Sequence, residues 1–219
     1  MNNHISQNDF RVARGKSEAG IVVGNTFDKY NSRNPVVRWM MRGFAANLNS
    51  LVKKAAPKSI YETGCGEGFW VLQWNAKGIT AQGSDFSRKA IAIARANARQ
   101  QGFSEDLFHI RSIYELSVEQ NGADLVVCCE VLEHLEEPEK ALQILATVAQ
   151  GYILLSVPRE PLWRLLNMAR GKYLNALGNT PGHVQHWNTR TFLKMVERYF
   201  SILEVRKPLP WIMVLAKSL

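Results

Sequence analysis

Residues 59–68 have the sequence SIYETGCGEG, in which a short, largely apolar run leads into three glycines. The run 59–63 predicts a strand, and Gly64, Gly66 and Gly68 predict a tight turn into a helix over about 67–77. Glycines at such a turn let the backbone approach a ligand closely. The stretch therefore predicts the first strand, turn and helix of an open α/β sheet that binds a ligand at the turn.

Strand and helix signals alternate on both sides of this stretch. A helix begins at Asn34-Pro35, Ser87 caps another that Gly102 ends, and a third begins at Glu137-Pro138. The other predicted strands of this region are 79–85, 108–112, 124–130 and 152–158. This alternation predicts a doubly wound, mostly parallel sheet with helices on both faces, the Rossmann-like class.

The C-terminal part departs from this alternation. A helix near 189–199 leads into two strand-like runs within 200–218 that a proline-containing turn separates. They predict an antiparallel hairpin at one sheet edge, which brings the sheet to seven strands. Before that helix, residues 158–188 form a long insertion rich in Arg, Asn, His, Trp and Tyr, and we expect it to be an acceptor lid.

Length and composition favour one soluble domain. The chain has 219 residues, of which 46% are apolar and 21% charged. We expect a flexible segment over 1–25, a single domain over 26–219, and a cytoplasmic location, because no signal peptide or transmembrane run is visible. The formal charge of +8 is spread along the chain, so charge alone does not indicate a nucleic-acid-binding protein.

The spacing around the glycine turn favours a nucleoside ligand with cationic groups. Asp85 follows Gly64 by 21 positions, at the end of the second predicted strand, where a carboxylate can accept hydrogen bonds from ribose. The turn lacks the G-x-G-x-x-G spacing that seats a pyrophosphate. Glu62 and Glu67 place carboxylates around it, which suits a sulfonium and an α-ammonium group. These observations indicate S-adenosylmethionine rather than a dinucleotide.

Three segments carry a family resemblance: ETGCGEG (62–68), GSDFS (83–87) and DLVVCCEVLEHL (124–135). They resemble motifs of the class I S-adenosylmethionine-dependent methyltransferases, in particular the ubiquinone-biosynthesis-like (methyltransferase type 11) branch. The resemblance implies S-adenosyl-L-methionine as cofactor and S-adenosyl-L-homocysteine as product. It implies cofactor contacts from Glu62, Gly64, Cys65 and Gly66 to the methionine part, from Asp85 to the ribose, from Phe86, Ser112 and Ile113 around the adenine, and from Cys129 and Glu130 beneath the sulfonium. Ser112 departs from the family, which often has an acidic residue there.

The segment after the fourth motif supplies acid–base candidates. A short helix there would point Glu130, Glu133 and His134 to one side, and we expect His134 and Glu130 to be catalytic, with His134 as a general base. The segment also resembles the E-x-x-E-H stretch of metal-dependent 2′-O-methyltransferases of small RNAs. His183 or His186 could complete such a metal site. We nevertheless expect no bound metal.

Polar and aromatic residues of the insertion are the acceptor candidates. They comprise Arg159 and Arg164 for an acidic group, Tyr173 and Trp187 as pocket walls, and His183 and His186 as hydrogen-bonding groups. We therefore expect O- or N-methylation of a polar or anionic small molecule. The alternatives are a methyltransferase of RNA or other nucleic acid, possibly metal-assisted, and a binding protein without turnover. Residues 161–177 are basic and amphipathic and suit peripheral membrane contact, whereas no recognition module for nucleic acid and no obligate protein partner is evident.

Overall fold

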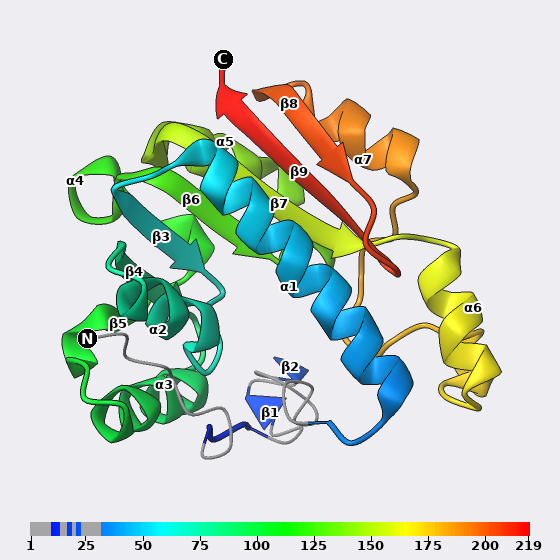
Figure 1. The fold of residues 1–219 in the computed structure, drawn as a ribbon. Helices are drawn as coiled ribbons and strands as arrows, with labels where there is room; N and C mark the ends of the chain where they lie inside the picture. Colours follow the sequence, from blue (N-terminus) through cyan, green and yellow to red (C-terminus); the bar gives the residue numbers. More distant parts are fainter. Residues whose placement is uncertain (1–9, 14–16, 19–20, 23–31) are drawn as a thin grey trace.

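The computed structural model of the chain describes residues 10–13, 17–18, 21–22 and 32–219. Its centre is a seven-stranded sheet in the order β5-β4-β3-β6-β7-β9-β8 (Figure 1). The strands are β3 (Ser59–Thr63), β4 (Thr80–Asp85), β5 (Phe108–Ile110), β6 (Ala123–Cys129), β7 (Ala149–Pro158), β8 (Phe200–Arg206) and β9 (Trp211–Ser218). The first five are parallel, and β9 pairs antiparallel with β7 and β8. The predicted mostly parallel sheet and its antiparallel C-terminal hairpin are confirmed.

Helices cover both faces of this sheet. They are α1 (Pro35–Ala55), α2 (Phe69–Ala76), α3 (Arg88–Gln100), α4 (Val118–Asn121), α5 (Pro138–Val148), α6 (Leu162–Ala169) and α7 (Thr189–Val196). Short 3-10 turns are η2 (Glu105–Leu107), η3 (Ile113–Glu115), η4 (Leu132–His134) and η5 (Leu174–Ala176). A small antiparallel pair, β1 (Ser17–Glu18) and β2 (Ile21–Val22), lies apart from the main sheet. No helix in the described part of the chain combines the length and the apolar character that crossing a membrane requires.

Side-chain caps start two helices where the sequence predicts them. The Asn34 side chain accepts hydrogen bonds from the first backbone N–H groups of α1, and the Ser87 hydroxyl accepts one from Ala90 in α3. Helix α2 begins at Phe69, two residues later than expected. Gly66 and Gly68 have φ of 53° and 82°, so the turn continues through both glycines before helical geometry begins.

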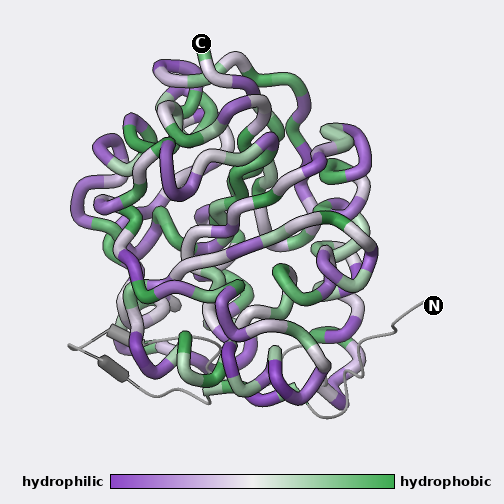
Figure 2. The backbone as a smooth tube through the Cα atoms, turned by 90° about the vertical axis from the view of Figure 1, so that its left-hand side faces the viewer, coloured by the Kyte–Doolittle hydropathy of each residue, from purple (hydrophilic) through white to green (hydrophobic). Residues whose placement is uncertain are grey.

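The core has two parts, one on each face of the sheet. On one face α1, α2 and α3 contribute Leu48, Trp74 and Ile91. On the other, α5 and α7 contribute Leu142 and Phe192. The turned view in Figure 2 shows hydrophobic segments running through the interior. Because the central strands are covered on both faces, their apolar runs are almost continuous.

The chain reverses its direction of sheet growth at β3. Strand β4 adds on one side of β3 and β6 on the other, so the carboxyl ends of β3 and β6 open onto the crevice where open α/β sheets bind ligands. The arrowheads of β3, β6 and β7 point toward the side that holds α6 and the start of α1 (Figure 1). The candidate site lies at these strand ends.

Candidate active site

The glycine turn joins the ends of three strands. The Cys65 N–H donates to the Ser84 carbonyl at 2.9 Å and the Gly66 N–H donates to Asp85 Oδ2 at 3.0 Å, which fixes the turn against β4. Gly64 has φ of 70°, and a Cβ added there would lie 2.2 Å from Cγ2 of Val131, just after β6. Only a glycine fits this contact, so the predicted need for glycine has a structural cause.

Asp85 organises the second strand end. Its buried carboxylate accepts from Gly66 through Oδ2 and from the Ser87 N–H through Oδ1 at 2.9 Å. It therefore holds both the glycine turn and the cap of α3. Phe86, the next residue, is exposed, as a residue that flanks a ligand would be. The ribose and adenine roles of Asp85 and Phe86 stay predictions.

Ser112 and Ile113 lie near this strand end. The Arg111 N–H donates to the Asp85 carbonyl, which brings the start of η3 beside β4. Ser112 caps η3 in a capping box with Glu115, and Ile113 is buried in the part of the core that α5 and α7 cover, here called the second core cluster. The Ser112 hydroxyl therefore caps a 3-10 turn and the Ile113 side chain packs in the core, and contact of either residue with adenine stays a prediction.

Glu62 and two thiols lie at the ends of the central strands. Glu62 is buried near the end of β3, and Cys65 and Cys129 follow β3 and end β6. Burial raises the pKa of both thiols. Nearby negative charge raises it further, from Asp85 and Glu62 at Cys65 and from Glu62 at Cys129. The thiols therefore stay protonated and are not nucleophiles. Their predicted part, contact with the cofactor, requires only the neutral form.

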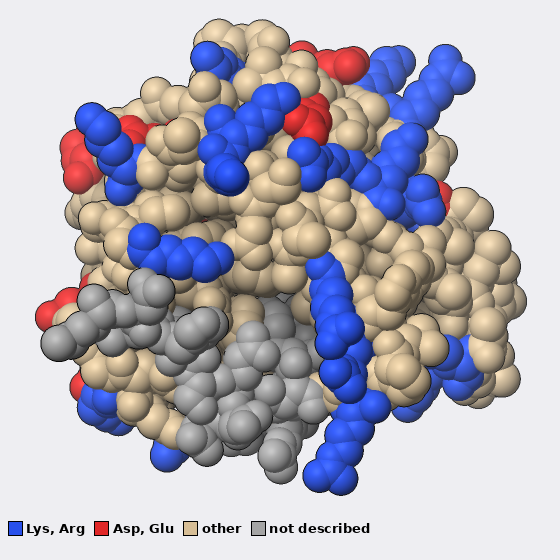
Figure 3. Space-filling model, viewed as in Figure 1, with Lys and Arg blue, Asp and Glu red and all other residues tan. Residues whose placement is uncertain are grey.

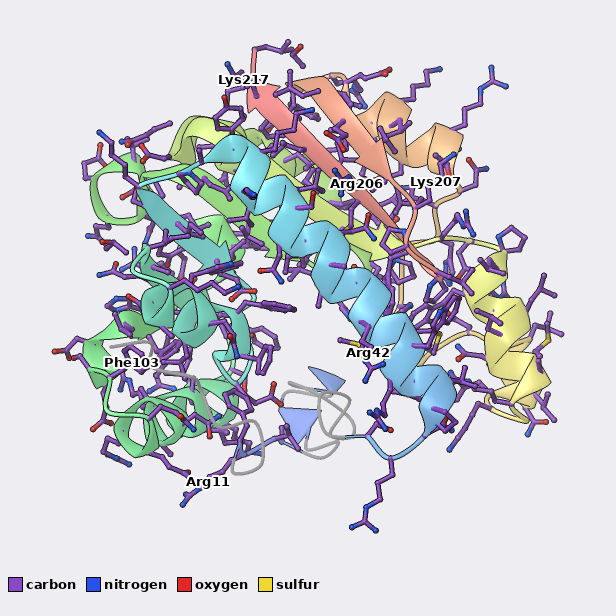
Figure 4. All side chains as sticks on the ribbon, viewed as in Figure 1. Arg11, Arg42, Phe103, Arg206, Lys207 and Lys217 are labelled. Carbon is purple, nitrogen blue, oxygen red and sulfur yellow. The ribbon has the colours of Figure 1, made fainter. Side chains whose placement is uncertain are left out.

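The Glu67 side chain was expected beside a ligand at the glycine turn, but it binds the N-terminal segment instead. Its carboxylate accepts the Ala13 N–H at 3.0 Å, and its carbonyl accepts from the Asn97 side chain, which also exchanges two hydrogen bonds with the Arg11 backbone. Figure 4 labels Arg11 beside α3. Glu67 thus anchors residues 10–13, and Glu62 is the carboxylate near the turn that would repel a pyrophosphate. The expected flexible segment 1–25 lies largely outside the described residues, but Phe10 and Ala13 are buried.

Glu130 turns toward the C-terminal strands. It has φ of 60°, in the left-handed region that non-glycine residues seldom adopt. Its Oε1 accepts from Ser156 Oγ at 2.9 Å and its Oε2 from Trp211 Nε1 at 2.6 Å. The carboxylate is therefore held in place by β7 and β9. It is not part of the potential metal-binding group that contains Glu133 and His134, and its catalytic role stays a prediction.

His134 lies at the centre of the remaining cluster. Its Nδ1 is 2.9 Å from the Gly182 carbonyl, and its ring meets that of His183 edge to face at 4.8 Å. A carbonyl oxygen only accepts, so Nδ1 carries the proton and Nε2 has the lone pair. Burial lowers the pKa of His134, although the hydrogen bond to Gly182 partly opposes it. The ring is therefore neutral near pH 7 and can accept a proton.

His183 and Glu133 complete this cluster. Burial, with the nearby His134 and His186, lowers the pKa of His183 to about 3. One potential ligand atom each of Glu133, His134 and His183 lies within 4.8 Å of the others, so among the described residues these three could hold a metal ion. Glu130 does not belong to this group. The expectation that no metal is bound stays a prediction.

The lid residues divide into inward and outward groups. His183 is inward, and Trp163 stacks on it at 5.9 Å. Arg164 donates to the carbonyls of Leu177 and Ala176, and His186 pairs with Asn179 at 2.8 Å, so both hold the lid itself together. Arg159 is half-buried and Tyr173 is exposed.

Trp187 requires a correction. It is buried against Phe192 of α7, at 5.7 Å between ring centroids, in the second core cluster. We therefore assign Trp187 to the core, where packing of α7 onto the sheet requires it, instead of to the acceptor pocket. Of the expected acceptor residues, the structure brings His183 to His134, while acceptor contacts of Arg159, Arg164, Tyr173 and His186 stay predictions.

Two further residues of the site, Ser156 and Trp211, are not among those predicted from the sequence. Both bind the Glu130 carboxylate. Ser156 carried a usable signal, since it is the polar residue within the apolar run 152–158. Trp211 carried none, because its contact joins residues 81 positions apart.

Comparisons with known proteins agree with this geometry. The family described as "Methyltransferase domain" matches residues 36–200. The ubiquinone biosynthesis O-methyltransferase of Chromobacterium violaceum is 28% identical over 104 residues, which is 46% of this chain and 44% of that protein. The O-antigen chain terminator bifunctional methyltransferase/kinase of Escherichia coli is 32% identical over 49% of this chain and 16% of its own length. The matched stretch thus spans about half or less of these curated relatives.

Solved structures share the fold. The magnesium protoporphyrin IX methyltransferase of Synechocystis PCC 6803 with bound S-adenosylhomocysteine has a TM-score of 0.66 at 19% identity, over 88% of this chain and 94% of that one. The methyltransferase domain of a bacterial Hen1 protein has a TM-score of 0.61 at 20% identity, over 81% and 99%. The glycine turn and its neighbouring strand ends therefore belong to a fold that this chain shares with these two structures.

Proposed function

This chain belongs to the class I S-adenosylmethionine-dependent methyltransferases, and we propose that it methylates a polar small molecule at a hydroxyl oxygen. The observation that carries the proposal is the hydrogen bond of His134 Nδ1 to the Gly182 carbonyl, which leaves the lone pair on Nε2. His134 follows Val131, the residue packed against the glycine turn, by three positions. A hydroxyl acceptor must lose a proton during methyl transfer, and a base in that place can take it.

The strand ends fit the cofactor. Gly64 lets the turn pack closely against Val131, Glu62 offers a buried negative charge near the turn, and Asp85 fixes the turn against β4. Bound S-adenosylmethionine would supply an electrophilic methyl group on a cationic sulfur. Because the sulfur leaves as a neutral thioether, the chain's residues have mainly to orient the acceptor and remove its proton.

Acceptor chemistry follows from the groups around His134. Nε2 of His134 is the proton acceptor, and the Gly182 carbonyl keeps the ring in this tautomer. Trp163 and His183 form an aromatic wall beside it. The named activity of the ubiquinone-pathway relatives, O-methylation, is the same class of reaction. We retain an anionic acceptor group and N-methylation as variants of this proposal.

A second candidate, metal-assisted hydroxyl methylation, rests on the Glu133, His134 and His183 group. A metal there would bind the acceptor oxygen and lower its pKa, and the alternative substrate class for such a site is RNA or another nucleic acid. The low pKa of His183 keeps its ring neutral, as a ligand requires. We favour the metal-free base.

Calorimetry with S-adenosylhomocysteine tests the cofactor site. We expect wild-type protein to bind it, and Asp85→Ala to bind about 10- to 100-fold more weakly, because the turn and the ribose lose an acceptor worth about 1–3 kcal/mol. The matched control is Asp124→Ala, since Asp124 also accepts two backbone N–H groups, from Lys58 and Ser59, at the opposite end of β3. Equal losses in both variants, or NADH binding without S-adenosylhomocysteine binding, would contradict the proposal.

A further inference from the structure

Exposed apolar side chains gather on the outer side of the lid and at the start of α1. Of the twelve large hydrophobic side chains that are exposed in the described part of the chain, six lie there. Trp39 and Leu174 have exposed fractions of 61% and 57%. A monomeric protein tolerates single exposed apolar residues, but a concentration of them marks an interaction surface. We call the surface formed by Val36, Trp39, Leu165, Tyr173, Leu174 and Leu177 the lid face.

The two parts of the lid face belong to one side of the molecule. Trp163 on α6 contacts Trp211 at 6.0 Å between ring centroids, and Trp211 contacts Phe44 on α1 at 5.0 Å. Both helices therefore flank the start of β9. Figure 1 shows α6 and the N-terminal end of α1 at the same lower right side of the molecule.

The charge of this side is strongly positive. Residues 32–52 and 159–188 together contain seven Arg or Lys residues and one acidic residue, Glu160. None of these seven takes part in the ion pairs found among the described residues. Figure 3 shows Lys and Arg side chains over the lower right of the molecule without acidic side chains among them, and Figure 4 labels one of the seven, Arg42, on α1.

We propose that the lid face binds the surface of an anionic lipid bilayer. Leucine and tryptophan side chains insert at the boundary between headgroups and acyl chains, while neighbouring arginines and lysines contact anionic headgroups. The combination favours a bilayer over nucleic acid, because exposed leucines contribute nothing to contacts with a phosphate backbone.

The inner side of the same helix reaches the candidate site. Trp163 on α6 stacks on His183, which contacts His134. A lid held at a bilayer would therefore place the site next to the lipid phase. The acceptor is therefore an amphiphile, a molecule with a hydroxyl-bearing head and an apolar part that enters from the membrane. This assignment rests on the proposed function.

Vesicle flotation tests the proposal with the full chain. We expect the protein to float with vesicles of equal parts phosphatidylcholine and phosphatidylglycerol, and about tenfold less with phosphatidylcholine alone. Leu165→Glu combined with Leu174→Glu should weaken binding to the mixed vesicles by more than tenfold. The matched control is Leu203→Glu, because Leu203 is an exposed leucine on β8, away from the lid.

Calorimetry with S-adenosylhomocysteine on the same variants separates this proposal from the proposed function. The lid variant should keep its affinity for S-adenosylhomocysteine within about twofold, whereas a failed cofactor site would show no heat in any variant and leave flotation unchanged. Absence of flotation with both kinds of vesicle would overturn the proposal and direct attention to a protein partner for the lid face. Equal losses in the lid variant and Leu203→Glu would overturn it as well.

Discussion

The hydrogen bond between His134 and the Gly182 carbonyl decides which ring nitrogen can react. With the proton on Nδ1, Nε2 is available as a base at neutral pH. Burial holds the pKa of His134 below its usual 6.5, so the reactive neutral form persists into mildly acidic solution. The neighbouring His183, with a pKa of about 3, stays neutral over the same range.

A pH profile follows from this assignment. We expect kcat/KM with the acceptor to fall on acidification below about pH 6.5, because a protonated His134 cannot accept the hydroxyl proton. His134→Gln should lower kcat by about 10²- to 10⁴-fold and remove this acidic limb. His109→Gln is the control, since burial and Arg111 also lower the pKa of His109, which lies on the edge strand β5. A His134→Gln enzyme that kept both its rate and its acidic limb would exclude His134 as the base.

At the scale of elements, the turn after β3 depends on the segment after β6. Gly64 combines a φ of 70° with a Cβ direction that ends 2.2 Å from Val131 Cγ2. Gly78 has a similar φ of 79°, but nothing lies within 4 Å of its Cβ position. The two glycines therefore separate the conformational cost of an alanine from the cost of its contacts.

Chemical denaturation of three variants tests this dependence. Gly78→Ala should lower the free energy of unfolding by about 1 kcal/mol through backbone conformation alone. Gly64→Ala should lower it by a further 1–3 kcal/mol or so, because the new methyl group overlaps Val131. Adding Val131→Ala to Gly64→Ala should recover about 1 kcal/mol relative to the sum of the single changes. Purely additive effects would show that the contact does not limit the turn.

Elements with local signals were predictable, and contacts between distant elements were not. The caps Asn34 and Ser87 act on N–H groups within three residues, so the sequence alone predicts where α1 and α3 begin. The direction of Glu67 depends on residues 10–13, and that of Trp187 on α7. Both glutamate and tryptophan are compatible with a ligand site or with the protein interior, and only the path of the chain decides between them.

For the whole molecule, the same principle separates fold from site. Alternating strands and helices predict a parallel sheet, and a parallel sheet predicts a site at its carboxyl edge, so Gly64 and Asp85 could be found without coordinates. The contacts of Glu130 with Trp211 and of His134 with His183 join segments 81 and 49 positions apart. They depend on how β9 and the lid fold back over the strand ends, which no local pattern records.

Buried neutral histidines should make the whole fold sensitive to mild acid. The pKa of His183 is about 3 in the folded chain and about 6.5 when unfolded, so the unfolded state binds more protons between these values. The stability that comes from the lowered pKa of His183 is therefore fully present above about pH 6.5 and is lost as the pH falls toward 3. From about pH 6.5 to 5, where most carboxylates remain ionised, this histidine should account for about 1–2 kcal/mol.

Chemical denaturation of wild type and His183→Gln across that pH range checks this expectation. The variant should be less stable near pH 7, because it loses the stacking with Trp163, yet it should lose less stability on acidification. His186→Gln is the control, because His186 is exposed and pairs with Asn179 at the lid surface. If His183→Gln and wild type lost equal stability between about pH 6.5 and 5, His183 would have to take up its proton without unfolding, and the lid would have to open to let it do so.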